Sequence, residues 1–282
     1  MGRSLKGYFP IFVLPLLLAF TVSFLIPFLA GVVLSFTEFT TVTDAKFVGL
    51  ANYIEAFSAG GDFLKALLFT VSVTAVSVLV VNVLAFALAL LLSRNFRGNH
   101  FFRTVFFMPN LIGGIVLGYI WQLLINGVLA NFGVDITFRQ AYGFWGIVML
   151  TAWQLIGYMM IIYIAGLQNI PPELHEAAAI DGANGRQMLR HVTFPMVAPS
   201  ITICTFLTLT NVFKTFDQNY ALTGGAPGKS TSMLALDIFQ TFYGSVGKEG
   251  VGQAKAVVFF LILAAFAAVQ QGIAKRKERG AI

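Results

Sequence analysis

Six apolar blocks of the sequence are each long enough to cross a lipid bilayer as a helix, which takes about 20 residues. They lie at Tyr8–Phe36, Leu64–Leu92, Thr104–Asn126, Tyr142–Leu167, Met196–Phe216 and Ala254–Ile273. Only 11% of the 282 residues are charged, whereas soluble domains contain about 25%. We therefore predict an all-α, polytopic membrane protein with six transmembrane helices, in a single domain over residues 1–282.

The first block follows Arg3 and Lys6, as the apolar core of a secretory signal would. Its apolar run is about twice the usual length of a signal core, and no site of small residues closes it cleanly. The sequence therefore predicts an uncleaved first helix.

Basic residues are distributed unevenly between the two sides of the predicted membrane. Eleven of the 18 Lys and Arg, but only four of the 12 Asp and Glu, lie in the termini and in the loops after the second and fourth blocks. Cytoplasmic segments of membrane proteins carry such an excess of Lys and Arg. We expect a multi-pass protein of the cell membrane with both termini in the cytoplasm. Nucleic-acid binding is not expected, because it requires basic residues gathered on one folded face.

Residues 223–231, "TGGAPGKST", look at first like a phosphate-binding loop. Such a loop needs Gly, four residues and then Gly-Lys-Ser or Gly-Lys-Thr, so that backbone N–H groups can wrap the phosphates. The residue five positions before Gly228 is Thr223, and the preceding stretch shows no buried strand. We therefore predict that no nucleotide binds here.

The segment from 168 to 195, between the fourth and fifth blocks, predicts two short helices. Pro172 can open the first helix because the first turn needs no N–H donors, and Glu173 lies where the helix dipole favours a carboxylate. Ala177–Ala179 are strong helix formers with almost no side chain, so another protein can approach the backbone closely. Gly182 is among the residues expected to end this helix before the second, shorter helical run begins.

This segment resembles the EAA loop of the membrane subunits of ATP-binding-cassette importers. The matching residues are Glu176, Ala177, Ala178, Asp181, Gly182, Ala183 and Pro195. The family usually ends the loop with Ile-x-Leu-Pro, and this chain has Val192 and Phe194 in the two apolar places, changes that should preserve packing. The resemblance implies a type I importer permease fold. It also assigns the matching residues to coupling with a separate cytoplasmic ATPase, whose closure the loop transmits to the membrane helices.

Three further stretches are similar to the carbohydrate-uptake branch of this family. They look like the first of two paired membrane subunits in maltose, glycerol-phosphate and multiple-sugar transporters. The stretches are "FVGLANYIEAF", "FFRTVFFMPNLIGGIVLGYIWQLLING" and "VFKTFDQNYALTGGAPGKSTSML". The last belongs to an expected outer loop, about 217–253, whose lysine would face away from cytoplasmic ATP. The resemblance implies the translocation subunit of an ATP-driven sugar or oligosaccharide importer.

The same resemblance implies several partners. They are two ATPase subunits, a second and related permease subunit, an extracellular or periplasmic solute-binding protein, and a sugar. The ATPase subunits would bind ATP and Mg, so we expect no cofactor on this chain. The sequence shows no nucleophile paired with a base and no metal-ligand spacing, and we predict that the chain itself is not an enzyme.

Sugars carry hydroxyls and apolar ring faces, so a membrane path for them should offer polar side chains and aromatic surfaces. Polar residues recur at helical spacing on the fourth and fifth blocks, where they must face protein or water. In the resembling maltose subunit, the helices flanking the EAA loop contact the sugar. The predicted substrate-path residues are Asn211, Thr208, Thr215, Tyr158 and Gln154. For each of them, packing between helices is the alternative role.

Lys214 and Asp217, near the outer end of the fifth block, are predicted to form an ion pair at the membrane boundary. Two alternatives to a sugar importer stay open at this stage. One is an importer for another solute, such as an amino acid or a sugar phosphate, although no Arg lies well inside a span to hold a phosphate. The other is a passive channel that works alone.

Overall fold

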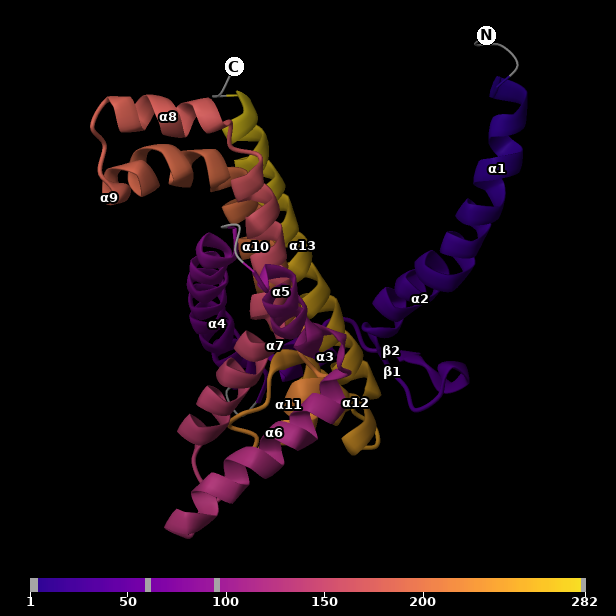
Figure 1. Cartoon of the computed structure of the whole chain (residues 1–282). Coiled ribbons are helices and arrows are strands. Elements are labelled where there is room, and N and C mark those ends of the chain that lie inside the picture. The colour runs from indigo at the N-terminus through magenta and orange to yellow at the C-terminus, as the bar shows by residue number, and fades with distance from the viewer. Residues whose placement is uncertain (1–4, 59–61, 94–96, 280–282) are drawn as a thin grey trace. The chain divides into compact units, whose positions relative to one another are not determined.

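The computed structural model describes residues 5–58, 62–93 and 97–279. These residues are almost entirely helical, with one two-stranded antiparallel hairpin (Figure 1). Six helical segments are long and apolar enough to cross a membrane. They are Val13–Leu34, Asp62–Leu92, Gly114–Phe132, Gln140–Gln168, Gly185–Phe213 and Glu249–Gln270. The predictions of an all-α class and of six spans are therefore confirmed.

The third predicted span is divided into two helices. α5 (Asn99–Phe107) and α6 (Gly114–Leu129) are separated by the 3-10 turn η3 (Met108–Leu111). Pro109 and Gly113 lie at this break, and both disfavour a continuous helix. Proline lacks the N–H donor that a helix needs, and glycine loses more backbone conformational freedom in a helix than other residues do. The segment able to cross the membrane therefore begins with α6, later in the chain than the sequence predicts.

The fifth span begins earlier than the sequence predicts. α9 (Gly185–Met188), the π-helical turn η5 (Leu189–Thr193) and α10 (Phe194–Phe213) form one continuous helical path. Pro195 lies in the first turn of α10 instead of ending a separate short helix. The π turn just before it changes the hydrogen-bond spacing, so the helix continues past the missing N–H donor of the proline.

The chain divides into two compact units, each described separately. The first contains Met1–Phe63 and Ile238–Ile262, and the second contains Leu64–Asp237 and Leu263–Ile282. The elements of the first unit up to residue 58 are α1 (Leu5–Phe20), η1 (Thr21–Leu25), α2 (Ile26–Leu34), β1 (Thr37–Glu38), η2 (Val42–Asp44), β2 (Lys46–Phe47) and α3 (Ala51–Ala56). Residues of α12 (Leu234–Gly244) and α13 (Glu249–Arg279) occur in both units. The single domain over residues 1–282 stays a prediction.

In the first unit, hydrogen bonds from side chains close the end of the first span. Asn52 on α3 donates from Nδ2 to the carbonyl oxygens of Ser35 and Thr37, at 3.0 and 2.8 Å. These carbonyls follow the last turn of α2, where a helix leaves its acceptors unused. In the hairpin, the carboxylate of Asp44 accepts the backbone N–H of Thr41 at 2.9 Å, and backbone bonds of this kind hold the pKa of Asp44 below its usual value.

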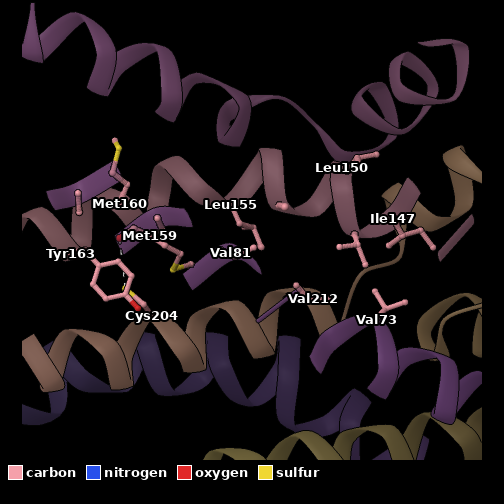
Figure 2. Close-up of a cluster of buried hydrophobic side chains, with 14 of the residues drawn as sticks. Val73, Val81, Ile147, Leu150, Leu155, Met159, Met160, Tyr163, Cys204 and Val212 are labelled. Atoms are coloured by element: carbon pink, nitrogen blue, oxygen red, sulfur yellow. Dashed lines mark hydrogen bonds between the residues drawn. The ribbon is translucent and has the colours of Figure 1, made fainter. Parts of the chain in front are cut away.

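The second unit is organised around one helix, α7 (Gln140–Gln168). In the apolar window of α7, 61% of the residues are buried, more than in any other described span. Its Ile147, Leu155 and Met159 pack in a core with Val81 and Val212 (Figure 2). The remaining elements of the unit include α4 (Asp62–Leu92), η4 (Ala130–Phe132), α8 (Pro172–Ile180) and α11 (Asp217–Leu222).

A glycine allows α5 to approach α7 closely. The position of a Cβ atom on Gly157 of α7 is already occupied by the carbonyl oxygen of Phe106 on α5. Backbone atoms cannot move aside as a flexible side chain can. Only glycine therefore fits at this contact.

We expect Gly157→Ala to destabilise the protein by about 1–3 kcal/mol, because the added methyl group forces α5 and α7 apart. The measurement is the thermal unfolding midpoint of the purified protein in detergent. Gly127→Ala on α6 is the matched control, since nothing lies within 4 Å of a Cβ atom there. Equal midpoints for the two variants would contradict the described contact.

Candidate functional site

A polar cavity of about 300 Å³ lies in the second unit, where the end of α10 meets α7 and α11. Its polar and charged lining residues are Asn110, Thr151, Gln154, Asn211, Lys214, Thr215, Asp217 and Gln218. Leu155 and Phe216 add apolar surface, Phe216 as an aromatic ring. A cavity that combines hydrogen-bonding groups with an aromatic face suits a polyhydroxylated ligand.

Two amide side chains bridge the elements around the cavity. Gln218 of α11 donates from Nε2 to Oε1 of Gln154 on α7, at 2.8 Å. Gln154 donates in turn to the carbonyl oxygen of Ile112 at 3.4 Å. This carbonyl is free of the helical pattern because the chain is extended at Ile112, between η3 and α6. The break in the third predicted span therefore supplies an acceptor at the cavity.

α11 is held against α6 by two glycines spaced four residues apart. A Cβ atom on Gly114 would lie 2.7 Å from Cβ of Asp217, and one on Gly118 would lie 2.5 Å from Cβ of Ala221. Such small-residue spacing lets two membrane helices approach closely. Gln122, one turn further along α6, donates to the carbonyl oxygen of Leu222 at 3.0 Å. The wall of the cavity formed by α11 is thus fixed by its packing on α6.

The predicted substrate-path residues fall into two groups. Asn211, Thr215 and Gln154 line the cavity, whereas Thr208 and Tyr158 do not. Thr208 is fully buried, and its hydroxyl donates to the carbonyl oxygen of Cys204 at 2.8 Å. Their roles in transport stay predictions. Asn110 and Gln218 also line the cavity. The sequence analysis missed them because they lie outside the polar residues that recur at helical spacing on the fourth and fifth blocks.

A polar network away from the cavity joins three helices. Tyr163 of α7 donates its hydroxyl to Oδ1 of Asn82 on α4 at 2.7 Å, and Asn82 donates from Nδ2 to the hydroxyl of Thr208 on α10 at 3.4 Å. Each of these groups has a partner within the protein. The network therefore acts as a connection between helices.

Lys214 and Asp217 both line the cavity and both are exposed. The sequence predicts an ion pair between them. Within residues 5–58, 62–93 and 97–279, no ion pair or hydrogen bond joins the Lys214 ammonium or the Asp217 carboxylate to another group. The predicted ion pair is therefore wrong. α10 ends at Phe213, just before Lys214, and Asp217 begins the separate helix α11, so the two side chains do not lie one turn apart on a single helix.

The predicted coupling segment contains two short helices, α8 and α9, and α8 contacts η5, the turn that continues α9 (Figure 1). α8 ends with Gly182 in the left-handed region, at φ 76°. The N–H of Gly182 bonds to the carbonyl of Ala179 at 3.1 Å, and the N–H of Ala183 bonds to that of Ala178 at 2.9 Å. This pair of bonds is a Schellman turn, which favours glycine at its left-handed position.

One face of α8 and its turn is open. Of the predicted coupling residues, Glu176, Ala177, Asp181, Gly182 and Pro195 are exposed, while Ala178 and Ala183 are half-buried. Ile180, a large apolar side chain, is 85% exposed. It lies outside the membrane-crossing helices, so lipid does not account for this exposure. An exposed apolar residue on a small-residue helix is suited to contact with another protein. The coupling roles stay predictions.

α8 also borders a cavity of about 760 Å³ in the second unit, which the exposed Glu176 helps to line. Its lining residues are Leu90, Ser93, Leu167, Gln168, Ile170, Pro172, His175, Glu176, Gly185, Met188, Leu189 and Thr193. The coupling segment is therefore loosely packed against the ends of α4 and α7.

The loop that carries the Gly-Lys-Ser stretch is organised around a buried asparagine. Asn219 donates from Nδ2 to the carbonyl oxygen of Thr231 at 2.8 Å and accepts the backbone N–H of Met233 at 2.9 Å. The element before the loop is the helix α11, not the strand that a phosphate-binding loop follows. In the described part of the chain, no group of three or more His, Cys, Asp or Glu is arranged to hold a metal ion.

Membrane-crossing helices, a polar cavity bordered by two of them and a helical pair between the fourth and fifth spans are features of a membrane transport subunit. The chain belongs to the family of binding-protein-dependent transport system inner membrane components, which residues 82–279 match. The resemblance to importer permeases is thereby confirmed.

Two relatives and one solved structure extend this finding. The chain is 40% identical over 277 residues to the probable starch degradation products transport system permease protein of Thermoanaerobacterium thermosulfurigenes, covering 95% of this chain and 94% of that protein. It is 30% identical over 274 residues to the trehalose/maltose transport system permease protein of Thermococcus litoralis, covering 93% and 91%. Its fold is similar to a chain of a bacterial ABC transporter involved in alginate import, with a TM-score of 0.81 at 17% identity, covering 97% of this chain and 98% of that chain.

We expect Asn82→Val to destabilise the protein by about 1–3 kcal/mol, because the buried Tyr163 and Thr208 then each lose a hydrogen-bond partner. Asn211→Leu is the comparison. It should change stability far less, since Asn211 donates only to the carbonyl of Leu207 on its own helix. Thermal unfolding of both variants in the same lipid nanodiscs measures the difference. A larger loss for Asn211→Leu would contradict the distinction between network and cavity.

Proposed function

We propose that the chain is the translocation subunit of an ATP-driven importer of sugars or oligosaccharides. Membership of a binding-protein-dependent transport family supports the importer class. The sugar class is supported by the relatives for starch degradation products and for trehalose and maltose. The cavity offers amide and hydroxyl groups to the hydroxyls of a sugar and the Phe216 ring to its apolar face.

The observation that carries the proposal is the unbroken helical path Gly185–Phe213. Its first residues belong to the helical pair that resembles a coupling loop, and its last turn bears Asn211 at the cavity. Closure of an ATPase against α8 would move this path as one body. The motion would shift the cavity between outward-facing and inward-facing states, driven by the differential affinity of the ATPase for the two.

The proposal includes the partners that such a mechanism needs. They are two ATPase subunits that bind ATP and Mg, a second and related permease subunit, and an extracellular or periplasmic solute-binding protein. The chain itself performs no chemistry in this scheme and holds no cofactor. Both termini lie in the cytoplasm, on the side of α8 and α9, in keeping with the distribution of Lys and Arg.

Reconstitution of the complex in liposomes tests the function. We expect uptake of a labelled maltooligosaccharide that requires internal ATP and the solute-binding protein. Uptake of equal rate by this chain alone, with no ATPase, would instead identify a passive channel. Uptake of an amino acid or a sugar phosphate in place of the saccharide would identify a different importer.

We expect Gly182→Pro to uncouple ATP hydrolysis from uptake, because proline cannot adopt the positive φ of this turn. Uptake should fall to near background, while the complex still assembles and hydrolyses ATP. Gly185→Ala is the matched control, since nothing lies within 4 Å of a Cβ atom there.

Glu176→Lys provides a second test that leaves the turn intact. It reverses a charge on the exposed face of α8, and we expect the same loss of coupling. Normal transport by both Gly182→Pro and Glu176→Lys would refute the assignment of this segment to an ATPase contact.

A further inference from the structure

Among the residues that the structure describes, two bring charge to the polar cavity. Lys214 and Asp217 are its charged lining residues, and the other polar groups around it are the neutral amides and hydroxyls already described. The net charge of the lining is therefore zero, although both charges stand apart from any ion pair within the described parts of the chain. An unpaired ionisable residue on the path of a membrane transporter is a candidate for contact with cargo.

The backbone fixes the position of each charge. Lys214 follows the last residue of α10, where its N–H bonds to the carbonyl of Thr210 at 3.4 Å. Asp217 is the first residue of α11, and its Cβ packs on Gly114 so closely that a methyl group there would lie at 2.7 Å. The two residues belong to different helices, so the cavity keeps a cation and an anion at separate points of its wall.

We propose that Lys214 and Asp217 together form a charge filter that favours uncharged polyhydroxylated cargo. A hydroxyl can accept a hydrogen bond from the ammonium or donate one to the carboxylate, and one sugar ring offers several hydroxyls for both. An anionic cargo is attracted by Lys214 and repelled by Asp217, and a cationic cargo meets the reverse, so neither sign of charge gains from the pair, whereas a neutral polyol can bond to both residues. This inference rests on the proposed function, and it adds the charge class of the cargo.

The two charges act in opposite directions, so their removal has opposite effects. Asp217→Asn leaves Lys214 as the charged lining residue, and the cavity becomes selective for anions. Lys214→Gln leaves Asp217, and the cavity becomes selective for cations. Since both side chains are exposed, solvent and salt weaken their electrostatic interaction with a charged cargo. We therefore expect each substitution to change the affinity for a charged saccharide, relative to a neutral one, by about 3- to 10-fold.

Competition binding to the purified complex in lipid nanodiscs tests the filter. The solute-binding protein is left out, so that its own selectivity does not enter. Labelled maltotriose is the bound probe, and methyl glucoside, glucuronate and glucosamine are the neutral, anionic and cationic competitors. We expect Asp217→Asn to strengthen competition by glucuronate relative to methyl glucoside, and Lys214→Gln to strengthen competition by glucosamine.

Two further variants provide controls for net charge. Asp135→Asn and Lys229→Gln make the same changes of charge at exposed residues that do not line the cavity, and they should leave the competitor ratios unchanged. The double variant Lys214→Gln with Asp217→Asn should lose selectivity between the two charged competitors. The filter is refuted if the single variants shift both charged competitors in the same direction, or not at all, while the wild-type complex binds maltotriose. Failure of the wild-type complex to bind any saccharide would instead count against the proposed function.

Discussion

The hydrocarbon interior of a bilayer offers no hydrogen-bond partners, so polar groups on a membrane-crossing helix depend on the protein for theirs. The second unit meets this requirement in two ways. Asn82, Tyr163 and Thr208 satisfy one another across three helices, and their network is closed. Around the cavity, Gln154 and Asn211 also have partners, but they border open space. The first arrangement holds helices together, and the second leaves polar surface for a solute.

The same requirement explains how much could be predicted from the sequence. Membrane helices need long apolar runs, and these runs gave all six spans and the helical class. The order of small, acidic and glycine residues from Glu176 to Ala183 was enough to predict two short helices separated by a turn. Gly182 lies in the left-handed position of that turn, where any other residue would be strained. Such local signals can be read without knowledge of tertiary contacts.

Other features depended on packing and could not be predicted from the sequence. Thr208 and Asn211 are three residues apart on one polar stripe, yet one faces the helix network and the other the cavity. Periodicity cannot separate them, because the difference lies in which neighbour each residue meets. The acceptor at Ile112 depends on a break in the third predicted span. The sequence shows that Lys214 and Asp217 have opposite charges. It does not show that a new helix, α11, begins at Asp217 and keeps the two side chains apart.

The π turn Leu189–Thr193 has a consequence for how the protein can change length. A π turn accommodates an additional residue relative to an α-helix. Loss of one residue within it can be absorbed by conversion to regular α geometry, with the flanking helices kept in register. The same deletion elsewhere in α10 would rotate everything beyond it by about 100° and turn Asn211 away from its neighbours. Tolerance of single-residue deletions along this path should therefore be concentrated at a single turn.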